Sequence, residues 1–313
     1  PAYQAATETA RRMLGYIVSR WGWSSHVAVW EYFNEADPGL PTGPFYQALA
    51  DHLDEADPYR HPRTTSTWSP SPKDWRLPAL DIAQTHHYIR PANGPAEHDA
   101  VAALLGQLRP MLRESGTKPV MIGEFGLADD QWRLSPLMAR DVDLVHFHQA
   151  LWASTMSGAA GTALFWWWKE LGQQNAPPHY RSLADFIDLA DFPDPALATF
   201  ERDLGEVRVL GWAGPRRMIA WLYDRRANWH ARVVEGQPAR EVAGLEFSPE
   251  GITPGAYQVT WWDTWRGAAI SGQQVEIGKP PAGLPVPALT GDIALLIERS
   301  EERRVGKECR SRW

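Results

Sequence analysis

The sequence predicts an α/β domain followed by a smaller all-β module. In the first 195 residues, short apolar runs alternate with amphipathic helical stretches, which is typical of βα units on a parallel sheet. From about residue 196, strand-like pieces follow one another between Gly, Pro, Asn and Asp turns, without a long helical pattern. We therefore expect domains at 1–195 and 196–299. The basic, patternless tail 300–313 is expected to be non-native or disordered.

The first domain is predicted to begin with a helix over 3–20, because its apolar residues recur at helical spacing. Three further helical patterns end at Asp-Pro, at Gly or in a Ser-Gly pair; they cover 45–56, 97–115 and 141–157. Between them lie apolar or β-branched runs bounded by turn residues. The strands predicted from these runs are 26–33, 63–67, 80–88, 119–125 and 161–168.

The second domain is predicted to be an antiparallel sandwich of short strands. Its strand-like pieces read RVLGWA, RMIAWLYD, HARVVEG, AYQVTWWDT, QQVEI and DIALLIE. Trp261, Trp262 and Trp265 cluster in this module. We expect them to serve packing, whereas a sugar-binding role would require that they share one exposed flat face.

Composition excludes several functions. A net charge of −7 without a Lys/Arg stripe argues against nucleic-acid binding. No uninterrupted apolar run of about 18 residues occurs, so we expect no membrane span. The only cysteine, Cys309, rules out internal disulfides and cysteine-based zinc sites. The 17 tryptophans suit either packing or a sugar-binding cleft, since indole combines a flat apolar face with a polar edge.

Polar side chains gather where the predicted strands end. Asn34 and Glu35 end the first strand, and Glu124 sits between apolar residues and glycines in MIGEFG. A buried carboxylate is costly unless it has a partner or a purpose. In a (β/α) barrel the carboxyl ends of the strands build the active site. Two carboxylates facing each other there suit glycoside hydrolysis, with one as acid and the other as nucleophile.

Four segments resemble clan A glycoside hydrolases, especially the cellulase-like enzymes of family 5. SRWGWSSHVAVWEYFNEAD resembles their fourth-strand segment, which ends in an Asn-Glu pair, and LDIAQTHHY resembles the sixth strand with its His-x-Tyr pair. KPVMIGEFG resembles the seventh-strand segment and GTALFWWW the eighth. The resemblance covers roughly residues 3–170 in the family's order. It implies a partial TIM (β/α)8 barrel containing about strands 4–8, with a small sandwich after it.

The resemblance also implies the roles of individual residues. Glu35 corresponds to the acid/base and Glu124 to the nucleophile. Asn34 would bond the sugar 2-hydroxyl, Tyr88 would orient Glu124, and His86 would lie near the acid/base or a sugar hydroxyl. A buried histidine without a role in binding is the alternative for His86.

Aromatic residues are expected to line the cleft. The family's eighth strand ends in a substrate-stacking tryptophan, and period two would place Trp166 and Trp168 on one face. Trp68 is a further subsite candidate, with an ordinary loop aromatic as the alternative. The helical residues His146 and His148 are two apart and so face different directions, from which we predict no metal site.

These features predict a retaining hydrolase of β-linked glucan or mannan, without cofactor or metal. The alternatives are an exo-acting β-glycosidase of the same clan, a non-catalytic carbohydrate-binding protein, and a barrel enzyme with a glutamate pair around a metal. We expect a monomer with a carbohydrate as its partner, and a secreted or periplasmic parent protein. Because the resemblance begins at the third helix, we expect these 313 residues alone to turn over little or nothing.

Overall fold

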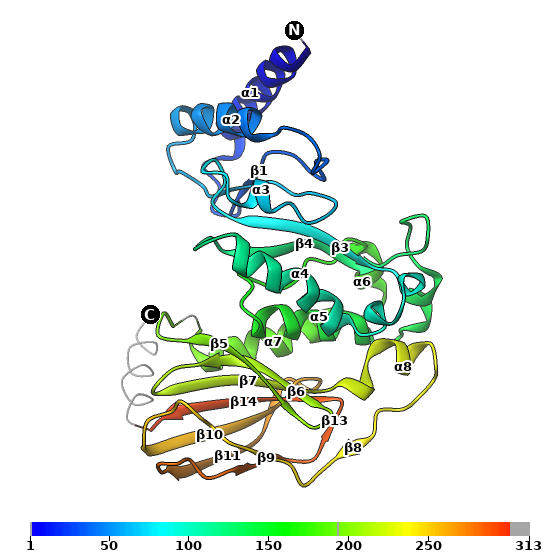
Figure 1. Cartoon of the computed structure of the whole chain (residues 1–313), viewed down its shortest axis with the longest axis vertical. Helices are drawn as coiled ribbons and strands as arrows, with labels where there is room; N and C mark the ends of the chain where they lie inside the picture. The colour runs from blue at the N-terminus through cyan, green and yellow to red at the C-terminus, as the bar shows by residue number, and fades with distance from the viewer. Residues whose placement is uncertain (1, 193, 301–313) are drawn as a thin grey trace. The chain divides into compact units, whose positions relative to one another are not determined.

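The computed structural model describes residues 2–192 and 194–300 (Figure 1). The chain forms two compact units that alternate along the sequence. Unit 1 comprises Pro1–Tyr88, Gly106–Phe125 and Ala159–Leu164; unit 2 comprises Ile89–Leu105, Gly126–Gly158 and the residues from Phe165 onward. The domain limits at 195 and 299 stay predictions. Apart from Ser300, the predicted tail lies outside the described residues.

Two helices supply most of the core of unit 1. They are α1 (Ala2–Trp21) and α2 (Gly43–Ala56), both where the sequence predicts them, and a short α3 (Pro72–Trp75) follows. Leu14 and Val18 of α1 pack in one buried cluster with Leu49 and Leu53 of α2. The second residue of α2 is a proline, whose fixed φ suits a first helical turn.

The strands of unit 1 form two pairs. β1 (Trp30–Glu31) is parallel to β2 (Arg63–Thr64), and β3 (Ala83–Ile89) pairs with β4 (Val120–Leu127). These strands confirm four of the five predicted strand positions, although β1 and β2 have only two residues each and are much shorter than predicted. Pairing beside β1 continues irregularly as far as a parallel bridge between Ala36 and Thr67. The segment that follows β1 is thereby held against the segment that follows β2.

The prediction of a strand over 161–168 is wrong. Leu164 is bonded to β4 on both sides, since its N–H donates to the Ile122 carbonyl at 3.1 Å and its carbonyl accepts from Phe125 N–H at 2.8 Å. The pairing does not continue, because helix α6 (Trp168–Gln173) begins a few residues later. The apolar run therefore lies along β4 without forming a regular strand.

Unit 2 is built partly from helices. The predicted third and fourth helices are α4 (Ala100–Glu114) and α5 (Val145–Met156), of which α4 continues into unit 1. All twelve residues of α5 are buried, so the helix is covered on every side, including its polar members. Three further helices were not predicted from the sequence: α6, α7 (Pro177–Ala190) and α8 (Trp229–Val233). The 3₁₀ turns are Pro91–Asn93, Pro95–Glu97, Pro136–Arg140 and Arg225–Ala227.

A six-stranded antiparallel sheet, in the order β11-β10-β14-β7-β6-β5, dominates the rest of unit 2 and confirms that this part of the chain forms antiparallel strands (Figure 1). Its strands are β5 (Ala198–Leu204), β6 (Val207–Ala213), β7 (Arg217–Asp224), β10 (Gly255–Asp263), β11 (Ala268–Ile277) and β14 (Asp292–Arg299). Two short antiparallel pairs accompany it: β8 (Glu241–Val242) with β13 (Leu289–Thr290), and β9 (Glu246–Phe247) with β12 (Leu284–Pro285).

One predicted strand of this module is a helix. HARVVEG lies mostly in α8, whose first turn is capped by the side chain of Asn228, which accepts from Ala231 N–H at 2.9 Å. Such a cap satisfies a helix N–H group that would otherwise lack a partner. The β-branched valines favoured a strand, but the preceding asparagine was the signal for a helix start.

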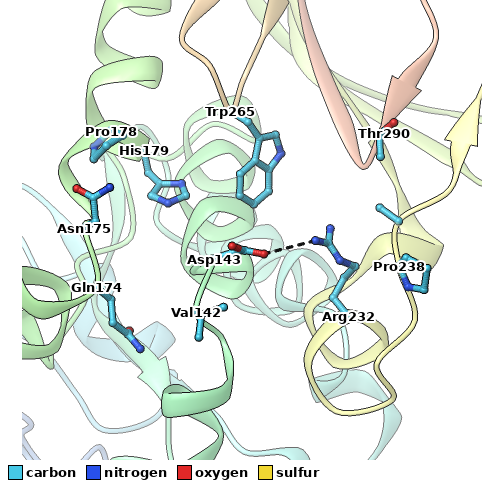
Figure 2. A pocket seen from close by; sticks show the side chains of 11 residues that line it. Val142, Asp143, Gln174, Asn175, Pro178, His179, Arg232, Pro238, Trp265 and Thr290 are labelled. Carbon is cyan, nitrogen blue, oxygen red and sulfur yellow. Dashed lines mark ion pairs between the residues drawn. The ribbon is translucent and has the colours of Figure 1, made fainter.

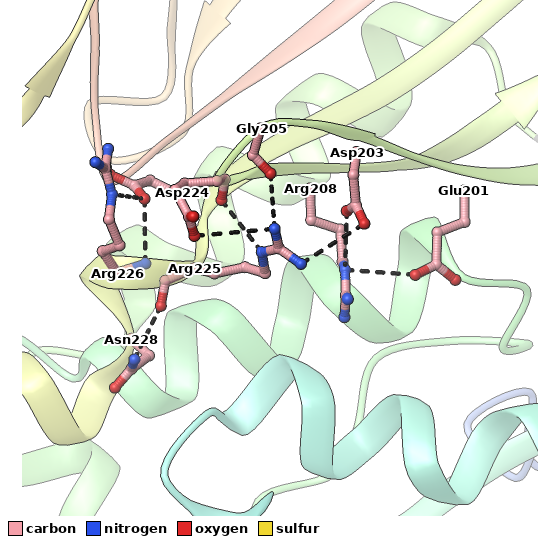
Figure 3. Close-up of polar contacts among 9 residues, drawn as sticks. Glu201, Asp203, Gly205, Arg208, Asp224, Arg225, Arg226 and Asn228 are labelled. Carbon is pink, nitrogen blue, oxygen red and sulfur yellow. Dashed lines mark hydrogen bonds and ion pairs between the residues drawn. The ribbon is translucent and has the colours of Figure 1, made fainter.

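Charged side chains cross the hairpin of β5 and β6 (Figure 3). Arg208 lies 3.4 Å from Glu201 and 3.6 Å from Asp203, and Arg225 reaches Asp203 at 3.6 Å and donates to the Gly205 carbonyl at 2.7 Å. Because these groups are partly exposed, each ion pair contributes at most about 1 kcal/mol. The network supports the hairpin register.

Among the described residues, no helix is long and apolar enough to cross a membrane.

Candidate active site

Two carboxylates and one imidazole converge in unit 1. His86 Nδ1, on β3, lies 3.0 Å from Glu35 Oε1 and 3.1 Å from Glu124 Oε2. One oxygen from each carboxylate and a ring nitrogen all lie within 4.8 Å of one another. The structure therefore brings together the two glutamates and the histidine that the sequence analysis selected.

The backbone at Glu35 adopts an unusual conformation. Its φ is 53°, in the left-handed region, which costs a residue with a Cβ roughly 1–2 kcal/mol. Its N–H donates to Ser66 Oγ at 2.9 Å, and Ser66 N–H donates in turn to the Phe33 carbonyl at 3.2 Å. Strained residues of this kind cluster at functional sites. The hydrogen bond from Glu35 to the fully buried Ser66 holds the acidic residue against the segment after β2.

Ser66 was missed by the sequence analysis. It is a polar residue near the end of a predicted strand, and that position was the signal available. The same strand end carries Thr67, whose carbonyl accepts from His86 N–H at 3.2 Å. This short segment thus contacts both the acidic residue and the histidine.

Glu124 is set on β4 and is 8% exposed. The preceding Gly123 makes room for Gln84 of β3, because a Cβ at this position would lie 2.2 Å from Gln84 Oε1. Gln84 Nε2 donates to Glu31 Oε1 at 2.9 Å. The glycine therefore allows the two strands to approach while Gln84 keeps its bond to Glu31, the carboxylate that comes shortly before Glu35.

Tyr88 donates a hydrogen bond from its hydroxyl to Glu124 Oε2, the same oxygen that His86 approaches. Burial raises the pKa of Tyr88, and the negative charge of Glu124 raises it further, so the hydroxyl keeps its proton at neutral pH. One oxygen of Glu124 is thus held by two donors from alternate residues of β3.

His86 is 4% exposed, and burial by itself would lower its pKa. The hydrogen bonds and negative charges of Glu124 and Glu35 outweigh burial, so the pKa of His86 is raised above its usual value. A proton on Nδ1 satisfies both carboxylates at once, whereas an unprotonated Nδ1 would face two acceptors. The imidazole therefore couples the charges of the two glutamates.

The same three side chains have the composition of a metal site. An imidazole nitrogen with two carboxylate oxygens can ligate a divalent cation such as Zn²⁺ or Mn²⁺. In the described part of the chain, this is the only cluster of three such side chains with that spacing. The absence of a metal requirement therefore stays a prediction for experiment to test.

The other predicted site residues, Asn34, Trp68, Trp166 and Trp168, are exposed on the surface. Asn34 is exposed directly before Glu35, and Trp68 is 54% exposed directly after Thr67. Trp166 and Trp168 are 49% and 74% exposed and belong to unit 2, so their role in the cleft stays a prediction. Trp168 begins α6, and period two therefore does not relate it to Trp166.

The fold occurs in glycoside hydrolases. A structure described as a glycoside hydrolase matches with a TM-score of 0.61 at 14% identity, over 94% of this chain and 69% of that one. A family 5 glycoside hydrolase from Bacteroides vulgatus ATCC 8482 matches with a TM-score of 0.64 at 13% identity, over 98% and 70%. A family 30 subfamily 8 xylanase from Clostridium acetobutylicum gives 0.51 at 12% identity, over 96% and 72%.

A further match, a putative glycoside hydrolase from Bacteroides vulgatus ATCC 8482, has a TM-score of 0.52, and the chain spans only 55% of its length. No family model and no curated protein matches the sequence. The predicted resemblance to clan A glycoside hydrolases is confirmed at the level of the fold.

Proposed function

We propose that the protein is a retaining glycoside hydrolase in which Glu124 is the nucleophile and Glu35 the acid/base. The observation that carries the proposal is the separation of the two carboxylates, whose nearest oxygens lie within 4.8 Å. Retaining enzymes place their carboxyl groups about 5–5.5 Å apart, whereas inverting enzymes need about 6.5–9.5 Å to admit a water molecule. The short distance supports direct attack by a carboxylate.

The environments of the two glutamates support this division of roles. Glu124 is the more buried, and Tyr88 and His86 hold one of its oxygens, which leaves the other oxygen to attack the anomeric carbon. The Glu35 side chain is 39% exposed, so it can exchange its proton with a leaving group and then with water. Asn34, beside Glu35, would bond the sugar 2-hydroxyl.

His86 would stabilise the negative charge on each glutamate in turn during the reaction. When Glu124 forms the glycosyl bond it loses its negative charge, while Glu35 becomes negative by giving its proton to the leaving oxygen. His86 Nδ1 lies within 3.1 Å of both carboxylates. The imidazole can therefore stabilise whichever glutamate is negatively charged without moving. Hydrolysis of the intermediate reverses this transfer.

We also propose how the two units correspond to the predicted barrel and sandwich. The strands of unit 1 and the segments that join them would correspond to about strands 4–8 of a TIM barrel. The six-stranded sheet would form one layer of a sandwich, and the short β9–β12 and β8–β13 pairs part of the other. This is supported by the buried cluster in which Phe247, Leu284 and Leu289 of those pairs pack against the sheet. The substrate would be a β-linked polysaccharide of the glucan or mannan type, and the exposed Trp68 would contact it in unit 1.

The test is to trap the glycosyl-enzyme. Activated aryl 2-deoxy-2-fluoro-β-glycosides of glucose, mannose and xylose are incubated with the 313 residues and with the longest protein that contains them. The fluorine slows both steps, while the good leaving group keeps the first step faster, so the intermediate accumulates. We expect an adduct of one sugar on the Glu124 peptide, and activity that survives chelation by EDTA. An adduct on another residue, or full loss of activity with EDTA, would contradict the proposal.

A further inference from the structure

Unit 2 contains a cavity of about 620 Å³ whose lining includes none of the residues assigned to catalysis (Figure 2). Its volume falls in the range of small-molecule sites, about 300–1,000 Å³. The walls come from the segment before α5, the α6–α7 turn and start of α7, α8 with the loop after it, and the β10–β11 turn with β13. Such convergence of separate segments resembles a binding site more than a gap beside one loop.

Trp265 is the aromatic member of this cavity. It extends from the β10–β11 turn into the space between His179 and Arg232 (Figure 2). One face of the indole stacks on His148, with ring centroids 4.0 Å apart and an interplanar angle of 19°. His148 is itself held by Asp292, 3.2 Å from its Nε2. His179 meets the ring edge-on with centroids 5.5 Å apart, and the ring also packs against a buried apolar cluster. The ring is therefore fixed, and the part of its surface that lines the cavity can contact a ligand.

Trp261, Trp262 and Trp265, which are close together in the sequence, have different environments in the structure. Trp261 and Trp262 are buried, at 1% and 8% exposure, as the packing prediction requires. They do not share an exposed flat face with Trp265, so the version of sugar binding considered from the sequence is wrong. Of the three, Trp265 lines this cavity.

Polar groups surround the ring. Gln174 and Asn175 lie in the turn between α6 and α7, and Asn175 has a φ of 55°, a left-handed conformation that asparagine tolerates. Asp143 and Arg232 face each other at 3.8 Å, with the Asp143 side chain 64% exposed (Figure 2). Amide, carboxylate and guanidinium groups together offer the donors and acceptors that sugar hydroxyls need.

The cavity has no net charge near neutral pH. Of its lining residues, Asp143 and Arg232 carry opposite charges. Burial and the neighbouring His148 lower the pKa of His179 to about 4, so His179 is neutral. The lining thus has no net attraction for an anionic or cationic ligand, and a neutral polar ligand needs none.

We propose that this cavity is a second carbohydrate-binding site, which holds a neutral oligosaccharide against Trp265. The proposal rests on the proposed function for the choice of a sugar as ligand, and the site itself is independent of Glu35 and Glu124. Its effect would be to hold a polysaccharide chain on the protein.

The experiment measures binding by isothermal titration and saturation-transfer NMR in a Glu35→Gln/Glu124→Gln background, which prevents hydrolysis. The probes are neutral β-1,4-linked hexaoses of glucose, mannose and xylose, together with an oligouronate as the charged comparison. Asn175→Gly keeps the left-handed backbone and removes the amide, Arg232→Met removes the charge, and Trp265→Phe reduces the platform. Trp132→Phe, an exposed tryptophan outside the cavity, and Arg113→Met are the matched controls.

We expect a neutral hexaose to bind, each cavity variant to weaken binding about tenfold or more, and the controls to leave it unchanged. Tenfold corresponds to about 1.4 kcal/mol, the size of one or two lost hydrogen bonds. No binding of any neutral hexaose, preferential binding of the oligouronate, or equal affinity in cavity and control variants would overturn the proposal. The Glu124 adduct tests the catalytic proposal separately, so the two can fail independently.

Discussion

The carboxylate of Glu35 and the imidazole of His86 lie 3.0 Å apart, although 51 residues separate them in the sequence. The same nitrogen is 3.1 Å from Glu124 on the neighbouring strand. A single imidazole therefore links the two carboxylates, and perturbing any of the three should change the others.

The two glutamates should respond differently to removal. With an aryl glycoside that has a good leaving group, Glu35→Ala should slow the first step little but slow hydrolysis of the intermediate strongly, because that leaving group needs no acid. Azide should restore turnover and yield a β-glycosyl azide. Glu124→Ala should lose at least about 10⁴-fold in kcat, and azide should yield the α-product. NMR of the azide products distinguishes the two, and the same anomer from both variants would contradict the assignment.

Replacement of His86 should change the dependence of stability on pH. Its folded pKa is raised above the unfolded value of about 6.5, so its stabilising contribution is fully present below pH 6.5 and is lost as pH rises through the folded pKa. His86→Asn should therefore lower the free energy of unfolding most at pH 6 and less as the pH rises toward 9, measured by urea denaturation. His26→Asn, which removes an exposed imidazole, is the control. A loss that grows with pH would argue against the coupling.

Tyr88→Phe removes the hydroxyl that donates to Glu124. The freed oxygen should be less well oriented, and we expect kcat to fall about 10- to 100-fold with KM nearly unchanged. Steady-state kinetics with an aryl glycoside measures the change. Tyr59→Phe, at a tyrosine that is 63% exposed, should leave both constants at the wild-type values. A rise in KM alone would instead indicate that Tyr88 binds substrate.

Gly123→Ala should destabilise unit 1. The new Cβ would lie 2.2 Å from Gln84 Oε1, so Gln84 must move and lose its hydrogen bond to Glu31. We expect a cost of about 1–3 kcal/mol, typical of overpacking, measured by chemical denaturation. Adding Gln84→Ala should recover part of that cost, because the two residues are in contact. Gly161→Ala, where a Cβ meets nothing within 4 Å, is the control. Strict additivity of the two changes would contradict the clash.

Asp141→Asn should weaken the start of α5. Burial alone would raise the pKa of Asp141, but His146 and the N–H groups of Val145 and His146 outweigh it, so its pKa is lowered. A lowered pKa contributes stability above the unfolded value of about 3.9, which is lost as pH falls through the folded pKa.

We therefore expect the Asp141→Asn variant to lose about 1–3 kcal/mol at pH 7, the cost of leaving buried donors poorly satisfied. The difference from wild type should narrow below about pH 4. Thermal denaturation from pH 3 to pH 8 checks both statements. Asp185→Asn, an exposed aspartate on α7, is the control. A difference that stays constant with pH would show that the ionised carboxylate is not what stabilises this turn.

The alternating helices and strands of the first part and the antiparallel strands of the second could be predicted from the sequence alone. So could the candidate residues Glu35, His86, Tyr88 and Glu124. These follow from local signals, namely hydrophobic period, turn residues and polar side chains at strand ends. Local signals failed where a contact distant in sequence decided the outcome. The run 161–168 has strand composition, but it meets β4 too briefly to form a strand.

The distances between these residues, on which their chemistry depends, could not be predicted from the sequence and follow from the packing of the chain. The spacing of Glu35 and Glu124, the left-handed backbone held by Ser66, and the raised pKa of His86 all depend on side chains from other segments. The cavity around Trp265 is of the same kind, since its walls come from five separate stretches of unit 2. The spacing of apolar residues in a sequence shows which face of a helix or strand is buried. A binding or catalytic site depends instead on which helices and strands lie next to one another, and the packing of the whole unit determines that arrangement.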